Sequence, residues 1–139
     1  MDKQEMMQTL KRYRGLHLEC QRYRKRIADK RNTIYDVKAV VTSGANVRSG
    51  AIADRVERVI EKLNLLIDFY TRKMEEAEEA ERQITELIDR VSDNEERVVL
   101  FMHYIEGKSF LEIADVLYLS ERTVWYRHGC AINSLCNAV

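Results

Sequence analysis

The stretch Ser109-Phe-Leu-Glu-Ile-Ala-Asp-Val-Leu-Tyr-Leu-Ser-Glu-Arg-Thr-Val124 contains the signals of two short helices joined by a minimal turn. Ser109 and Glu112 have the spacing of a capping box, in which each side chain bonds a backbone N–H of the other residue. Ser120 is a second N-cap, and Glu121 follows it where the helix dipole favours negative charge. Only Tyr118-Leu119 separates the two helices, and this pattern predicts a helix-turn-helix.

The residues around this stretch predict three helices after residue 91. Ser92-Asp-Asn-Glu95 has the form of another capping box, so a helix is expected to start there. The inward-facing residues should be Val98, Phe101, Met102 and Ile105 in the first helix, Ile113, Val116 and Leu117 in the second, and Val124, His128, Ala131, Ile132 and Leu135 in the third. We therefore expect residues 92–139 to form a helix-turn-helix domain whose last helix covers residues 120–135.

Residues 1–91 are expected to form an antiparallel helical hairpin, which would make the protein all-α. Residues 51–91 have an a/d coiled-coil seam at Ile60, Leu63, Ile67, Tyr70, Met74, Ala77, Glu81, Ile84, Ile88 and Val91. Residues 1–41 have a more ragged helical seam at Leu16, Tyr23, Ile27, Ile34, Val37 and Val41. The turn should lie at about residues 42–50, which are mostly small and include two glycines, and residue i should then pair with about residue 94 − i.

Composition excludes several classes of fold and function. The 139 residues include no Pro and five Gly, which argues against an all-β fold that depends on tight turns. No apolar run is long enough to span a membrane, and the first residues lack the apolar core of a signal peptide, so a cytoplasmic protein without membrane contact is expected. Signatures of nucleophilic catalysis, phosphate loops and metal sites are missing, so no enzyme activity, cofactor or metal is predicted.

The charges sum to zero but are unevenly distributed along the chain. Residues 1–50 carry 12 basic and 5 acidic side chains, whereas residues 51–92 carry 7 basic and 11 acidic ones. In the hairpin, the basic run from Lys11 to Arg31 would lie opposite the acidic run from Glu75 to Glu81. The pattern favours a solvated flank that pairs with the acidic helix, and a face that follows nucleic-acid phosphates is the alternative.

Residues 95–135 resemble region 4 of bacterial sigma factors, a helix-turn-helix module that recognises promoter DNA. The resemblance rests on Ser109, on Glu-Ile-Ala at 112–114, on Ser-Glu-x-Thr-Val at 120–124 and on Arg127. The layout of a helical hairpin followed by this module is also similar to small phage and prophage late transcription regulators of the ArpU type. Tyr118 stands where the family usually has glycine, and a left-handed conformation there would cost about 1–2 kcal/mol.

These resemblances imply a transcription regulator that binds double-stranded DNA in the bacterial host cell, with RNA polymerase as a candidate partner. If the last helix enters the major groove, its outward side meets the bases. The candidate base contacts are Glu121, Arg122, Trp125 and Tyr126, which can bond base edges or touch a thymine methyl group. The candidate phosphate contacts are Lys108, Ser109, Thr123 and Arg127.

Two other functions are compatible with the same residues. One is a phage DNA-packaging subunit resembling the small terminase, because such subunits also combine a helix-turn-helix with oligomerising helices. The other is a helical protein-interaction module without DNA binding. The seam of the hairpin is expected to be its own core first, and a homo-oligomer interface is the alternative use.

Overall fold

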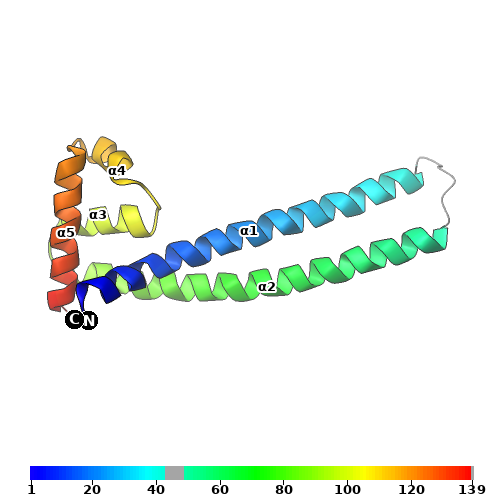
Figure 1. Cartoon of the computed structure of the whole chain (residues 1–139), viewed down its shortest axis with the longest axis horizontal. Coiled ribbons are helices and arrows are strands. Elements are labelled where there is room, and N and C mark those ends of the chain that lie inside the picture. The colour runs from blue at the N-terminus through cyan, green and yellow to red at the C-terminus, as the bar shows by residue number, and fades with distance from the viewer. Residues whose placement is uncertain (43–48, 139) are drawn as a thin grey trace. The chain divides into compact units, whose positions relative to one another are not determined.

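The computed structural model describes residues 1–42 and 49–138, in which helices are joined by short turns (Figure 1). The helices are α1 (Lys3–Thr42), α2 (Ser49–Asp89), α3 (Asn94–Tyr104), α4 (Phe110–Leu117) and α5 (Glu121–Ala138). This confirms the predicted all-α class, with two long helices followed by a helix-turn-helix. Most of the predicted turn at 42–50 falls on residues 43–48, which lie outside the described residues.

Contacts divide the chain into two compact units. The hairpin unit is Leu18–Glu75, and the terminal unit consists of Met1–His17 and Glu76–Val139. The expected domain boundary between residues 91 and 92 followed the sequence pattern, whereas this division follows spatial contacts. It assigns the first turns of α1 and the last turns of α2 to the same unit as α3, α4 and α5.

In the hairpin unit, α1 and α2 lie side by side and antiparallel (Figure 1). Lys73 Nζ lies 3.2 Å from Glu19 Oε2, and the rings of Tyr23 and Phe69 stack with centroids 6.3 Å apart. Both pairs place the register two residues from the predicted pairing of i with 94 − i. The hairpin topology was therefore predictable from the sequence. The exact register could be established only from the contacts between the two helices.

The inward side of α2 differs in part from the predicted seam. Ile60 and Met74 are exposed, whereas Leu66 and Ala80 are buried. The reason is that apolar residues are consecutive here, as in Leu65-Leu66-Ile67, so spacing alone does not decide which neighbour faces inward. The described seam residues of α1 are buried or half-buried as predicted, and the side chain of Val41 lies outside the described part.

The acidic run of α2 neutralises part of its own charge. Arg82 pairs with Glu79 at 2.7 Å and with Glu86 at 2.6 Å, all within α2. The hydrogen bond from Arg82 lowers the pKa of the Glu79 carboxyl group, and the more distant charge of Arg12 in α1 contributes less. The strongest effect on the Glu79 carboxyl group therefore comes from its own helix, and α1 adds a weaker attraction.

The terminal unit has two apolar clusters, and α3 contributes to both. Leu100, Tyr104 and Ile105 belong to a cluster with residues of α1, α2 and α5, while Val99 packs with α4 and the start of α5. The predicted inward side of α3 was therefore partly wrong, since Phe101 is exposed. A helix that buries two sides in different clusters does not show a single apolar stripe.

The ends of α3 and α4 show further local differences from the sequence pattern. Asp93, not Ser92, caps α3, because its side chain accepts a hydrogen bond from the Glu96 N–H at 2.9 Å. Val116 of α4 is exposed rather than inward, and Ala114 is buried beside Ile113. A helix as short as α4 presents few positions to the core, and the small Ala114 permits close packing there.

Candidate nucleic-acid interface

The connection between α4 and α5 holds the two helices in a fixed relation. Ser109 and Glu112 form the predicted capping box at the start of α4. Tyr118 ends α4 in the left-handed region with φ 55° and ψ 41°, and the Leu119 N–H donates to the Ala114 carbonyl at 3.0 Å. Ser120 caps α5, because its Oγ accepts from the Thr123 N–H at 3.1 Å. The turn is therefore short and is held by hydrogen bonds at the end of α4 and at the start of α5.

The conformation of Tyr118 makes the turn a site where substitution should increase stability. Tyr118 is 96% exposed, so its side chain contributes little packing. Glycine avoids the left-handed cost of about 1–2 kcal/mol but loses about 0.5–1 kcal/mol through chain entropy. We expect Tyr118→Gly to raise the free energy of unfolding by about 1 kcal/mol, measured by urea denaturation. Tyr118→Ala keeps the Cβ and should change little, and a destabilised glycine variant would contradict this account.

The buried side of α5 agrees with the prediction at every predicted position. The buried residues of this helix are Val124, His128, Ala131, Ile132 and Leu135. Val124 packs with Val99, Ile113 and Ala114 in one cluster, and the last three belong to the larger cluster of the terminal unit. Both halves of α5 are thereby anchored, which fixes the direction of its remaining side chains.

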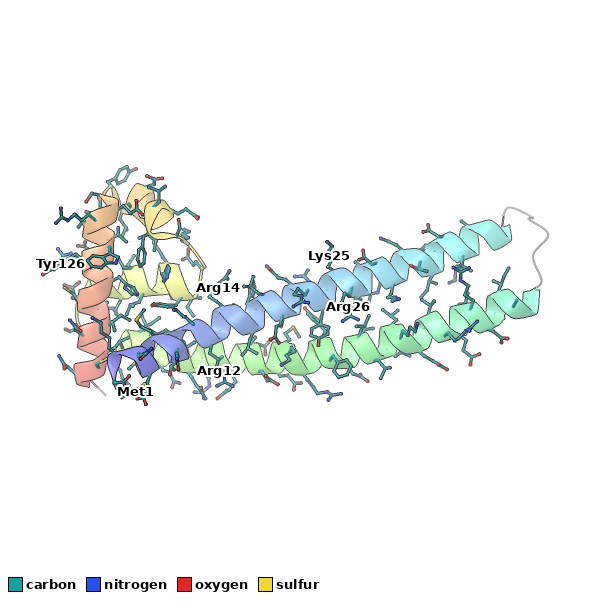
Figure 2. All side chains as sticks on the ribbon, in the orientation of Figure 1. Met1, Arg12, Arg14, Lys25, Arg26 and Tyr126 are labelled. Carbon is teal, nitrogen blue, oxygen red and sulfur yellow. The ribbon has the colours of Figure 1, made fainter. Side chains whose placement is uncertain are left out.

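The four predicted base-contact residues lie together on the outward side of α5. Glu121 and Arg122 are exposed, and Trp125 and Tyr126 are 66% and 63% exposed. Tyr126 projects from the surface of the helix (Figure 2). A hydrogen bond with the neighbouring Cys130 and the charge of that group raise the pKa of the Tyr126 phenol. The phenol therefore stays protonated near neutral pH and can donate a hydrogen bond.

The four predicted phosphate-contact residues lie on the same motif, but each has a partner within the chain. The Lys108 ammonium lies 3.0 Å from Glu106 Oε2. The Ser109 and Thr123 hydroxyl groups bond Glu112 and Ser120 at the helix starts. These residues are near the expected surface, yet their polar groups already take part in capping or ion pairing.

Arg127 forms an ion pair with a residue of another helix. Its Nε lies 3.3 Å from Glu95 Oε1, and this buried nitrogen has no aligned hydrogen bond. The contact is therefore an ion pair rather than a hydrogen bond. It connects α5 to the first turn of α3, so Arg127 has a structural role whether or not it reaches a phosphate.

The first turns of α1 border the same side of α5, which was not predicted from the sequence. Lys3, Met7 and Lys11 of α1 line a groove of about 490 Å³ together with Trp125 and Tyr126. The signal that could have indicated this contact is the spacing of Met6, Leu10 and Tyr13, which extends the apolar seam of α1 toward residue 1.

His128 connects this groove to the core. Its Nε2 and the Tyr104 hydroxyl oxygen lie 2.7 Å apart in a buried hydrogen bond, in which the imidazole tautomer decides which group donates. Burial lowers the pKa of His128 to about 4, and the charges of His103, Lys3 and Lys11 act in the same direction. His128 is therefore a neutral core residue, as predicted. Among the described residues, no three potential metal ligands gather at one place.

Residues 81–129 match the family model for sigma-70, region 4. The match extends from the last turns of α2 through the first half of α5, so it includes the whole helix-turn-helix. No curated protein and no solved structure matches the chain significantly. The helix-turn-helix of the terminal unit is thus similar to region 4 of sigma-70. None of the described helices combines the length and apolarity needed to span a bilayer.

Proposed function

We propose that this chain is a sequence-specific, double-stranded DNA-binding regulator of transcription that inserts α5 into the major groove. The observation that carries the proposal is the exposed side of α5 at residues 121–126, on a helix whose opposite side is buried in two clusters. The similarity of residues 81–129 to sigma region 4 supports it. A rigid helix with a free polar and aromatic side can enter a groove that admits one α-helix.

Each outward residue has a specific chemistry to offer a base pair. Arg122 can donate two hydrogen bonds to the O6 and N7 atoms of guanine, and Glu121 can accept one from the cytosine amino group. Trp125 offers apolar area to a thymine methyl group, and the Tyr126 hydroxyl group can bond a base edge. Lys108, Ser109, Thr123 and Arg127 are the proposed phosphate contacts, and each exchanges its partner within the chain for a phosphate oxygen when the duplex binds.

The proposed setting is a phage or prophage regulator in the bacterial cytoplasm that acts beside RNA polymerase. Sigma factors act with that enzyme, so similarity to their region 4 supports this partner. Exposed apolar side chains on the hairpin unit, among them Leu18, Leu65 and Phe69, support self-association as a second proposed contact. Light scattering at several protein concentrations measures that association directly.

The test of the proposal is a selection of bound duplexes from a random-sequence pool. We expect a shared motif, and we expect Arg122→Ala to bind the selected duplex about tenfold or more weakly, with a relaxed preference at one G·C pair. The matched control is Arg55→Ala, an exposed arginine of α2 in the hairpin unit, which should retain affinity. Both affinities are measured by fluorescence anisotropy.

Other results of the selection would favour the other two functions. Duplex binding without a shared motif, by a ring-like oligomer, favours a DNA-packaging subunit. No binding to any duplex at about 50 mM salt, where phosphate contacts are strongest, favours a protein-interaction module. Full affinity in Arg122→Ala would contradict the assignment of α5 as the recognition helix.

A further inference from the structure

The recognition helix has little positive charge for a DNA-binding element. Its cations are Arg122 and Arg127, and the second pairs with Glu95. Glu121 adds a negative charge on the outward side, and residues 93–139 carry 4 basic and 7 acidic side chains. Phosphate contacts by lysine and arginine supply most of the general affinity for DNA. A duplex bound by this helix therefore needs further cations, and the candidate sources are the basic first helix, a second copy of the chain and RNA polymerase.

The first three turns of α1 present two cations to the same surface. Lys3 and Lys11 line the groove of about 490 Å³ whose other wall includes Trp125, Tyr126 and Gly129 of α5. Both lysines are exposed, and no carboxylate of the described residues lies within ion-pair distance of either. They differ in this from Lys108 and Arg127, which have carboxylate partners.

The backbone that carries these lysines is held firmly against α5. Met6 and Leu10 are completely buried, in the same cluster as Ile132 and Leu135. Lys3 and Lys11 therefore project from an anchored helix, and Met7 between them packs against the cluster. Cations on an anchored element lose less entropy on binding a phosphate than cations on a mobile tail.

We propose that Lys3 and Lys11 bind the sugar–phosphate backbone of the duplex whose bases α5 reads. The groove suits that occupant, because its two ammonium groups complement phosphates and it borders Trp125 and Tyr126, the side chains proposed to meet the bases of the same duplex. The inference rests on the proposed function and adds a second element, from the opposite end of the chain, to the DNA-binding surface. It also assigns a function to part of the basic character of residues 1–50.

The test compares Lys3→Gln/Lys11→Gln with the wild type on two probes. One probe is a fluorescein-labelled duplex of about 30 base pairs with the selected motif, and the other is an unrelated duplex of equal length. We expect affinity to fall about tenfold for both probes, with an unchanged preference between them. The slope of log affinity against log salt should become less steep by about 2, since each phosphate contact contributes about 0.9.

A matched double variant controls for the loss of net charge. Arg55→Gln/Lys62→Gln removes two exposed cations from α2 in the hairpin unit and should keep the wild-type slope within error. Equal slopes in the wild type and the Lys3/Lys11 variant would overturn the inference while the proposed function stands, and the groove would then suit an acidic segment of a partner protein. If the wild type binds neither probe, the proposed function fails, and this inference with it.

Discussion

Leu10→Ala should destabilise the terminal unit by about 3 kcal/mol, although the helix-turn-helix begins a hundred residues later, at Phe110. Leu10 has no exposed surface and belongs to the cluster that contains Leu100, Ile132 and Leu135. Replacing it removes a buried isobutyl group and leaves a cavity among large side chains that relax only in part. Urea denaturation followed by circular dichroism measures the loss.

Leu18→Ala is the matched control for this prediction. Leu18 lies on the same helix and carries the same side chain, but it is 50% exposed and belongs to the hairpin unit. Both variants have nearly the same change in helix propensity, so their difference isolates burial. We expect the control to change the free energy of unfolding by less than about 1 kcal/mol. Equal effects would mean that Leu10 does not contribute to the terminal core.

The buried residues could be predicted from the sequence for a helix that buries one side. They could not be predicted fully for a helix that buries two sides. In α5 the spacing of Val124, His128 and Ile132 indicates one apolar stripe, and the structure buries all three. In α3 the adjacent pair Val99 and Leu100 enters two different clusters, which no single period describes. The hairpin register differs by two residues from the estimate of about 94 − i, because that estimate depended on an assumed centre of the turn rather than on contacts.

The residues of the candidate site that lie in the helix-turn-helix could be predicted from the sequence. Those that lie in α1 could not. The outward positions of Arg122 and Trp125 follow from the helical period once the buried stripe of α5 is known. The approach of Lys3 and Lys11 to α5 depends instead on tertiary contacts between the two ends of the chain. The spacing of Met6 and Leu10 indicates an apolar side of α1, but it does not say which helix covers that side.

Acid should weaken the native state before most carboxylates titrate, and His128 should be the cause. Burial and the nearby charges of His103, Lys3 and Lys11 lower its pKa to about 4 in the folded chain, against about 6.5 in an unfolded one. Above pH 6.5 both states hold a neutral imidazole, so the group has no effect. Between pH 6.5 and 4 the unfolded state binds the proton first, and stability falls by up to about 3 kcal/mol.

A series of denaturation curves between pH 7 and pH 5 tests this prediction in the range where aspartate and glutamate contribute least. His128→Gln can still form a hydrogen bond with Tyr104 as donor or acceptor but cannot gain a charge, so its stability should be nearly constant over that range. His17→Gln makes the same change elsewhere in the terminal unit, and a loss of slope confined to His128→Gln assigns the pH dependence to His128. The neutral His128 imidazole adds no positive charge to the groove beside Trp125, where Lys3 and Lys11 carry theirs. An imidazole signal of His128 that titrates near 6.5 in the folded protein would contradict both the acid sensitivity and this electrostatic description of the groove.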